Sequence, residues 1–113
     1  MAWKTQPYEI TVGNHRGNLR LWLENETFLS FSGFKVGKKY CTNYSKGKII
    51  LHSDLKGYEN LNILLTRNVS KKMKKGKESP VIDLCSKKVT ISMAGFSTAI
   101  VKYEKGKITL KGQ

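Results

Sequence analysis

The sequence predicts a small, β-rich α+β protein, a single domain over residues 1–113 that is built from two similar halves. Two blocks of sequence occur twice, in the same order. Residues 29–34 (LSFSGF) are echoed at 91–96 (ISMAGF), and residues 44–51 (YSKGKIIL) at 103–110 (YEKGKITL). Around these blocks, short runs alternate apolar and polar residues, which is typical of half-buried strands. A half of about fifty residues is too small to bury a stable core alone, so we expect the halves to pack together.

We expect the internal repeats at about 8–52 and 60–112, joined by a polar connector at about 53–59. In the first repeat, residues 8–12 (YEITV) and 19–23 (LRLWL) alternate as strands do. The intervening segment GNHRGN contains two glycines and two asparagines, which predicts a turn or an exposed loop. The first repeat therefore begins with two strands joined by a polar turn.

A short helix is predicted after the second strand. Asn25 suits a helix N-cap, and Glu26 places a carboxylate in the first turn, where the helix dipole favours negative charge. Gly33 stands at the helix C-terminus, where a left-handed residue is favoured. Residues 39–44 and 48–52 then predict a hairpin with glycine in its SKG turn.

The second repeat is expected to begin with strands at residues 61–66 and 81–84 (VIDL). Between them, residues 67–77 contain six cations and no acid, and Pro80 ends this basic segment. Because like charges at this density repel one another, the segment is predicted to be a loop that stays mobile until a polyanion binds.

Residues 87–95 leave two alternatives open. Ser86 is a suitable cap for a short helix, and the position of the segment in the repeat favours a helix, whereas residues 89–93 (VTISM) alternate and include β-branched side chains, as strands do. We adopt the helix. Residues 99–103 and 107–111 then predict the second hairpin, around EKG.

The net charge predicts a polyanionic partner. Twenty-one Lys and Arg against eight Asp and Glu give +13 and an isoelectric point near 9.9, which favours nucleic acid, an acidic protein or an anionic membrane surface. No apolar run approaches the roughly 20 residues that span a bilayer, and the first residues lack the apolar stretch of a secretory signal. We therefore expect a cytoplasmic protein with no membrane partner. Cys41 and Cys85 stand far apart in the sequence and are expected to be reduced thiols.

One ordered set of motifs resembles a known superfamily. In the first half it comprises residues 21–23, Asn25, 28–29, 32–37 (SGFKVG), Tyr44 and 47–51 (GKIIL); in the second half only 94–96 and 106–110 match, and the Gly after Phe is missing. The set resembles the swapped-hairpin domains of the SpoVT/AbrB superfamily, and within it the SymE-like proteins. The resemblance implies two swapped-hairpin-like halves packed as a single-chain pseudo-dimer. It also implies a DNA-binding transcription regulator or antitoxin-like module, or a SymE-like toxin that acts on RNA.

Basic residues of the two strand–loop–strand segments are the candidate nucleic-acid-binding residues. In a pseudo-dimer we expect the two loops to emerge side by side and form one positive face. The candidates are His15, Arg16, Arg20, Arg67, Lys71, Lys72, Lys74, Lys75 and Lys77. A charge of +13 exceeds the magnitude of about 2 to 8 that suffices for solubility. We therefore expect a nucleic-acid-binding protein, monomeric or weakly dimeric, for which the resemblance alone favours duplex DNA over RNA.

Aromatic residues lie among the charges. Tyr40 and Tyr58 are candidates for stacking on unpaired bases. Tyr44 and Tyr103 occur in both copies of the repeat and are expected to pack in the core, with their hydroxyls in water. Trp22 alternates with two leucines and is expected to be exposed on the opposite face.

No catalytic residue, metal site or cofactor is predicted. The chain lacks a phosphate-cradling Gly-rich motif, a nucleophile elbow and the paired carboxylates of a metal nuclease, so we do not expect an enzyme. A ribonuclease stays open as an alternative because His15, beside Arg16, is a candidate general base. The other alternative is a basic inhibitor of an acidic protein, from a virus or mobile element. The degenerate second half favours that alternative, because it breaks the symmetry that a palindromic DNA site demands.

Overall fold

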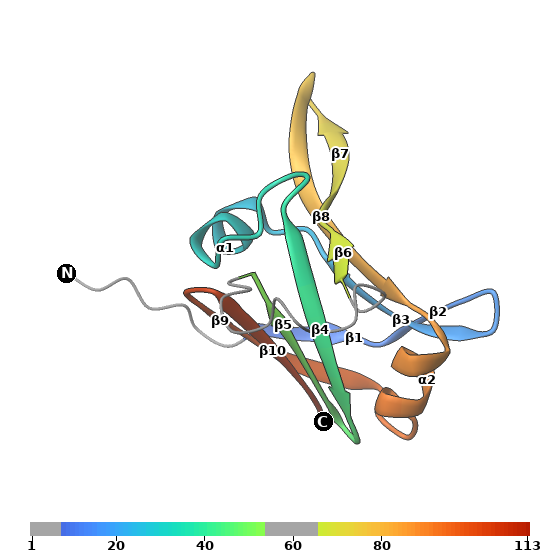
Figure 1. Cartoon of the computed structure of the whole chain (residues 1–113). Helices are drawn as coiled ribbons and strands as arrows, with labels where there is room; N and C mark the ends of the chain where they lie inside the picture. The colour runs from blue at the N-terminus through green and yellow to red at the C-terminus, as the bar shows by residue number, and fades with distance from the viewer. Residues whose placement is uncertain (1–7, 54–65) are drawn as a thin grey trace.

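The computed structural model of the protein describes residues 8–53 and 66–113. Figure 1 shows antiparallel strands arranged in two sheets, with two short helices packed beside them. The predicted β-rich α+β class is confirmed. None of the helices in these two ranges is long and apolar enough to cross a membrane.

The order of elements is the same in the two halves. The first half contains β1 (Tyr8–Thr11), β2 (Gly13–His15), β3 (Asn18–Leu23), α1 (Glu26–Phe31), β4 (Lys39–Ser45) and β5 (Lys48–His52). The second half contains β6 (Thr66–Asn68), β7 (Ser70–Lys74), β8 (Lys77–Cys85), α2 (Lys87–Met93), β9 (Thr98–Glu104) and β10 (Lys107–Gly112). Each described half thus runs through three strands, one helix and two strands. Both predicted hairpins, β4–β5 and β9–β10, are present.

Each sheet contains strands from both halves. The larger sheet has the order β1-β9-β10-β5-β4-β6, and the smaller has the order β2-β3-β8-β7. The halves meet at the centre of each sheet, where β5 pairs with β10 and β3 pairs with β8. Ile50 lies opposite Thr109 in the larger sheet, and Trp22 lies opposite Asp83 in the smaller. Backbone hydrogen bonds therefore join the two halves.

The apolar residues that alternate along the central strands form one core with side chains from both sheets. All of these residues are buried: Leu21, Leu23, Ile49, Leu51, Ile82, Leu84, Ile108 and Leu110. Each such side chain contributes roughly 1.5–3 kcal/mol by leaving water. The repeated KIIL and KITL segments thus meet in a shared interior, as two halves that are each too small for a core require.

Both helices begin where the sequence predicts. The Asn25 carboxamide oxygen accepts a hydrogen bond from the Phe28 N–H at 3.0 Å, and the Ser86 hydroxyl accepts one from the Val89 N–H at 3.4 Å. Of the two alternatives for residues 87–95, the structure contains the helix. Val89 and Met93, four residues apart, are both fully buried, so the local alternation is outweighed by a helical buried face.

Helix ends of one half cap the hairpin turns of the other. Gly47 and Gly106 have φ of 73° and 76°, as predicted for hairpin turns. The Gly47 N–H donates to the Ser92 carbonyl at 2.7 Å, and the Gly106 N–H donates to the Ser32 carbonyl at 3.1 Å. Each turn is therefore held by the helix end of the opposite half.

The turn predicted within residues 13–18 is present at Arg16–Gly17, whereas the basic segment predicted as a loop is instead part of a hairpin. Residues 13–18 also contain β2, which pairs with β3, and β7 pairs with β8 through five residue pairs, so the prediction of a loop at 67–77 is wrong. Both turns are two residues long with positive φ at each, Arg16–Gly17 and Lys75–Gly76, the conformation that matches strand twist. The alternation was hidden because polar residues occupy both faces of these strands.

Pro80 also lies within a strand, although the sequence predicted that it would end the basic segment. It pairs with Lys71 of β7, and β3 contacts β8 only over residues 82–85. Because β8 has a single paired neighbour at Pro80, the missing N–H costs no hydrogen bond to β3. The predicted strand 61–66 (except Thr66), the connector 53–59 (except Ser53) and Tyr58 lie outside the described residues.

Candidate nucleic-acid interface

The β7–β8 hairpin projects beyond the rest of the fold (Figure 1). Every residue from 70 to 78 is exposed, so this segment, here called the basic hairpin, contributes its side chains to the surface rather than to the core. It holds five of the predicted binding residues: Lys71, Lys72, Lys74, Lys75 and Lys77. The sequence prediction of a basic, solvent-facing segment was thus correct in position, although not in conformation.

Two of these five lysines are paired with carboxylates. The Lys71 ammonium lies 2.8 Å from Glu78, and this hydrogen bond raises the pKa of Lys71. The Lys72 ammonium lies 2.6 Å from Glu24, and its hydrogen bond lowers the pKa of that carboxyl group. Such pairs at the surface are worth little energetically, but they reduce the charge that each lysine offers to a ligand.

The other three lysines form the tip. Within the described ranges, Lys74, Lys75 and Lys77 have no carboxylate within salt-bridge distance. Lys74 and Lys77 are paired across the ladder, and Lys75 occupies the turn. The tip therefore concentrates three positive charges that have no salt bridge among the described residues over four consecutive positions of a two-stranded ribbon.

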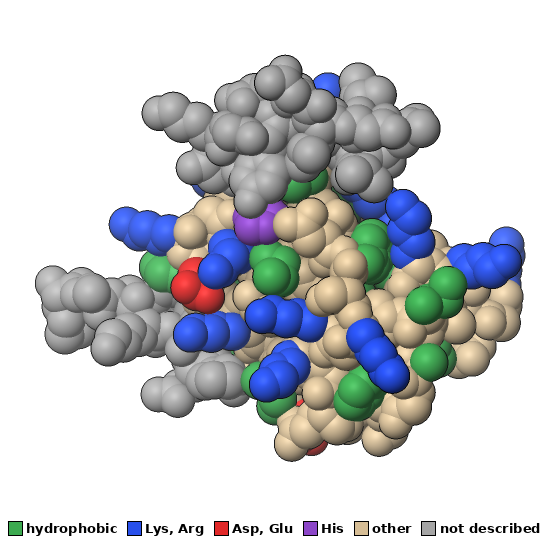
Figure 2. Space-filling view, turned by 60° about the horizontal axis from the view of Figure 1, so that its bottom comes forward, with side chains coloured by type: hydrophobic (Ala, Val, Ile, Leu, Met, Phe, Trp, Pro, Cys, Tyr) green, Lys and Arg blue, Asp and Glu red, His purple; other side chains and the backbone are tan. Residues whose placement is uncertain are grey.

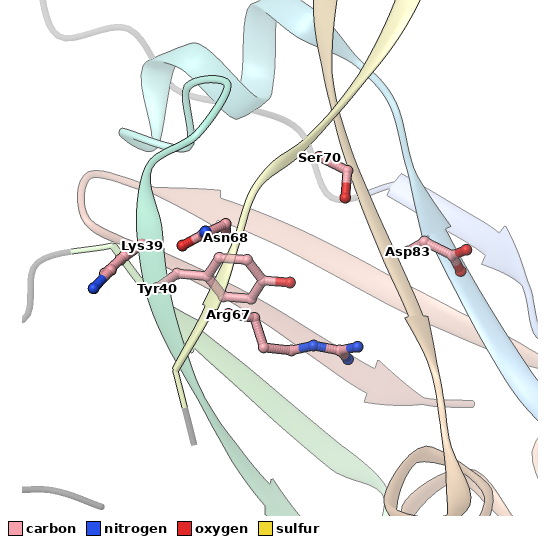
Figure 3. Close-up of a pocket in the computed structure, with 6 residues that line it drawn as sticks. All are labelled: Lys39, Tyr40, Arg67, Asn68, Ser70 and Asp83. Atoms are coloured by element: carbon pink, nitrogen blue, oxygen red, sulfur yellow. The ribbon is translucent and has the colours of Figure 1, made fainter. Parts of the chain in front are cut away.

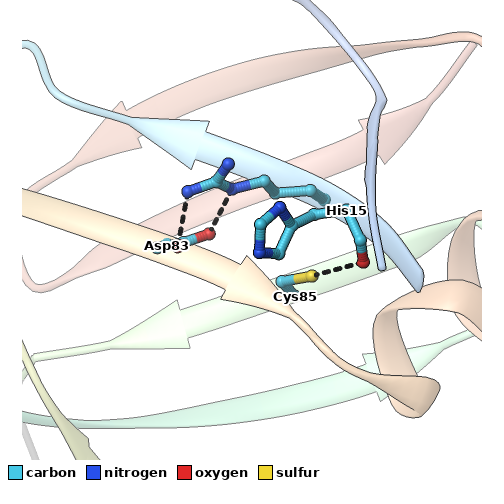
Figure 4. Close-up of polar contacts among 4 residues, drawn as sticks. His15, Asp83 and Cys85 are labelled. Atoms are coloured by element: carbon cyan, nitrogen blue, oxygen red, sulfur yellow. Dashed lines mark hydrogen bonds and ion pairs between the residues drawn. The ribbon is translucent and has the colours of Figure 1, made fainter. Parts of the chain in front are cut away.

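The predicted residues of the first half lie on the β2–β3 hairpin. His15 ends β2 and Arg16 occupies the turn, and both are exposed. Arg20 is held in place: its Nε and Nη2 each donate to an oxygen of Asp83 at 2.9 Å, and its guanidinium stacks 4.5 Å from the Trp22 ring centroid. Figure 4 shows the two contacts on Asp83. Arg20 therefore stabilises the smaller sheet, and its guanidinium is already engaged there.

The two hairpins do not emerge side by side, and this prediction is wrong. β3 and β8 are adjacent and antiparallel, and each tip immediately precedes one of them. The tips therefore extend from opposite ends of the smaller sheet, as Figure 1 shows. This geometry could not be predicted from the sequence, because it depends on which strands pair at the centre.

A second positive surface was missed. The buried residues Ile49, Val101, Ile108 and Leu110 alternate along β5, β9 and β10 with lysines on the opposite face of the larger sheet. These outer-face lysines are Lys48, Lys102, Lys107 and Lys111. Figure 2 shows Lys and Arg side chains spread over the face of the molecule that includes this sheet. The repeated KGK motif and the strand alternation together were the signal that could have identified it.

The aromatic residues divide as their burial dictates. Tyr40 and Tyr103 are buried, at 2% and 5% exposure, and Tyr44 packs partly against the core. The Tyr40 ring therefore cannot stack on a base. Trp22 is 38% exposed, which confirms its predicted position opposite the leucines.

The thiols and the metal-ligating residues offer little chemistry. Cys41 is buried, which raises the pKa of its thiol, and both cysteines are free. Over residues 8–53 and 66–113, no three His, Cys, Asp or Glu side chains gather closely enough to hold a metal ion. Comparison of the chain with protein-family models, with curated proteins and with solved structures found no significant match. Functional inference therefore rests on the geometry of this chain.

Proposed function

We propose that this protein binds nucleic acid, with duplex DNA as its preferred partner, through the basic hairpin. The observation that carries the proposal is the projecting, exposed ribbon of residues 70–78, whose tip holds Lys74, Lys75 and Lys77 with no salt-bridge partner among the described residues. Lysines placed in this way gain affinity by releasing counterions from phosphates. A two-stranded ribbon also fits the major groove of B-DNA, which is about 12 Å wide. Both considerations favour a duplex.

We further propose that the halves form a single-chain, swapped-hairpin pseudo-dimer, as the resemblance to the SpoVT/AbrB superfamily implies. In support, the strand order of each sheet reads the same in reverse when every strand is replaced by its counterpart in the other half. The capping hydrogen bonds from Gly47 to Ser92 and from Gly106 to Ser32 are also counterparts.

A test of this architecture uses the isolated first half. Residues 1–55 contain Ile49 and Leu51, whose strand pairs with β10 in the whole chain. The fragment should therefore be unfolded or should self-associate, as judged by circular dichroism and analytical ultracentrifugation. A cooperatively folded monomer would exclude the pseudo-dimer.

The hairpin tips of the two halves are chemically different. One carries His15 and Arg16, and the other carries the lysines of the basic hairpin. This asymmetry suits a regulator or antitoxin-like module that reads an asymmetric site or docks on phosphates without strict sequence preference. The lysine-bearing outer face of the larger sheet favours the second candidate function, binding to an acidic protein.

The direct test is a salt-titrated binding assay with duplex DNA, single-stranded DNA and RNA of the same sequence. The logarithm of the association constant should fall as the logarithm of the salt concentration rises. Three tip contacts predict a slope of about −2.7 or steeper. Duplex DNA should bind most tightly. Absence of binding to all three nucleic acids at up to roughly 100 μM, the weak end of non-specific binding, would refute the proposal, and capture of an acidic protein would then favour the second candidate.

A further inference from the structure

A polar cleft lies between the larger sheet and β8, near the base of the basic hairpin. It has a volume of about 410 Å³ and is lined by Lys39, Tyr40, Arg67, Asn68, Ser70 and Asp83. Figure 3 shows Tyr40 and Arg67 pointing from β4 and β6 toward β8, whereas the Lys39 ammonium points the other way. Tyr40 and Arg67, on neighbouring strands, thus point into one space, and Asp83 of β8 is among the residues that line it.

Tyr40 presents a fixed hydrogen-bond donor to this cleft. Its ring is 2% exposed and packs edge-on against Phe34, with ring centroids 5.7 Å apart. Its hydroxyl points toward the cleft (Figure 3) and has no hydrogen-bond partner among the described residues. Burial raises the pKa of Tyr40 to about 12, so the hydroxyl keeps its proton at neutral pH. A nearly buried tyrosine whose hydroxyl has no partner among the described residues indicates a place for an acceptor.

Arg67 supplies the charge. It pairs with Tyr40 across the β4–β6 ladder, and its guanidinium points toward β8 with no carboxylate within 4 Å over the described ranges. Asp83 lies across the cleft, but both of its oxygens accept hydrogen bonds from Arg20. Arg67 is therefore the cation whose charged group points into the cleft. Ser70 adds a second hydroxyl to the lining.

We propose that this cleft binds a single phosphate group, which Arg67 contacts through its guanidinium and Tyr40 through its hydroxyl. A phosphodiester carries one negative charge, opposite in sign to the Arg67 guanidinium that points into the cleft. The forked donors of a guanidinium suit its oxygens, and hydroxyls can satisfy the others. The proposal deepens and rests on the proposed nucleic-acid function: the tip lysines attract the duplex, and the cleft fixes the position of one backbone phosphate.

Two variants separate the roles of charge and hydrogen bond. Arg67→Gln should reduce the salt slope of duplex binding by about 0.9, the value for one phosphate contact. Tyr40→Phe should weaken binding about tenfold and leave the salt slope unchanged, because a neutral hydroxyl releases no counterion. The matched control for Tyr40→Phe is Tyr103→Phe, which removes the hydroxyl of another buried tyrosine outside the cleft. The matched control for Arg67→Gln is Lys102→Gln, which removes a cation from the outer face of the larger sheet.

A second measurement separates this proposal from the proposed function. Inorganic phosphate is titrated into the labelled full-length protein, and the Arg67 Nε–H resonance is followed by NMR. A saturable shift that is lost in Tyr40→Phe supports the cleft, even if wild type fails to bind duplex DNA and the proposed function falls. The cleft proposal would be overturned if both cleft variants kept the duplex affinity and salt slope of wild type and the Arg67 resonance did not shift with phosphate. That result would leave nucleic-acid binding intact.

Discussion

Replacement of the three tip lysines should change the salt dependence of duplex binding by a predictable amount. Lys74, Lys75 and Lys77 are exposed and form no salt bridge among the described residues, so a phosphate need not displace a paired carboxylate to reach them. At about 0.9 per contact, the variant with all three replaced by Gln should lose about 2.7 from the salt slope. Between about 50 and 200 mM salt, wild-type affinity should then fall about 40-fold more than variant affinity.

The neighbouring lysines should have a smaller effect on the salt dependence of binding. Lys71 and Lys72 already pair with Glu78 and Glu24, and a phosphate must displace these carboxylates before it gains either charge. Replacing both with Gln should therefore change the slope by less than two full contacts, that is, by less than about 1.8. Fluorescence anisotropy with a labelled duplex at several salt concentrations measures both effects.

The matched control removes the same number of charges from another surface. The variant Lys48→Gln, Lys102→Gln, Lys111→Gln alters the outer face of the larger sheet and should keep a wild-type salt slope. Thermal unfolding should be unchanged in the tip variant because its three side chains are exposed and contribute nothing to the core. Equal slope changes in the tip and sheet-face variants would refute the reasoning, because general charge attraction would then explain binding without a docking site.

Three further predictions concern stability and reactivity. Gly112→Ala should destabilise the fold by about 1–3 kcal/mol in chemical denaturation, because a Cβ there would lie 2.5 Å from the Phe96 ring; an unchanged midpoint would contradict that packing. Cys85 should react with a thiol reagent before Cys41, because Cys41 is buried and its thiol has a raised pKa. Mass spectrometry of partly labelled protein measures the order, and earlier labelling of Cys41 would contradict the prediction. Burial lowers the pKa of His52 below its usual 6.5, so neutral His52 contributes stability above about pH 6.5 that is lost as pH falls through the folded-state pKa. His52→Gln should therefore lose less stability on acidification than wild type. An equal loss in the two proteins would contradict this prediction.

Most of the local structure could be predicted from residues whose effect is local. Asn25 and Ser86 cap their helices through side-chain oxygens, and Gly47 and Gly106 supply the positive φ that their turns require. The alternating leucines of residues 19–23 placed Trp22 on the outer face. In each case the neighbouring sequence contains the whole physical cause.

The errors arose where distant strands decide the outcome. The lysine-rich segment 67–77 has no apolar face of its own, and it is ordered because β7 pairs along a β8 strand whose inner end is buried. The pairing of β3 with β8 sends the two tips to opposite ends of the sheet. Arg20 was predicted as a ligand contact, but Asp83, 63 positions away, engages its guanidinium. The cleft around Tyr40 and Arg67 likewise requires β4, β6 and β8 together.

The most direct test of the central claim is to map the nucleic-acid contact on the full-length protein by amide chemical shifts. A short DNA duplex is titrated into labelled protein at low salt, and every assigned amide is followed. The account predicts the largest shifts at residues 70–78 of the basic hairpin, with a second group around Arg67. Largest shifts on the outer face of the larger sheet, or no saturable shift at the hairpin, would contradict it.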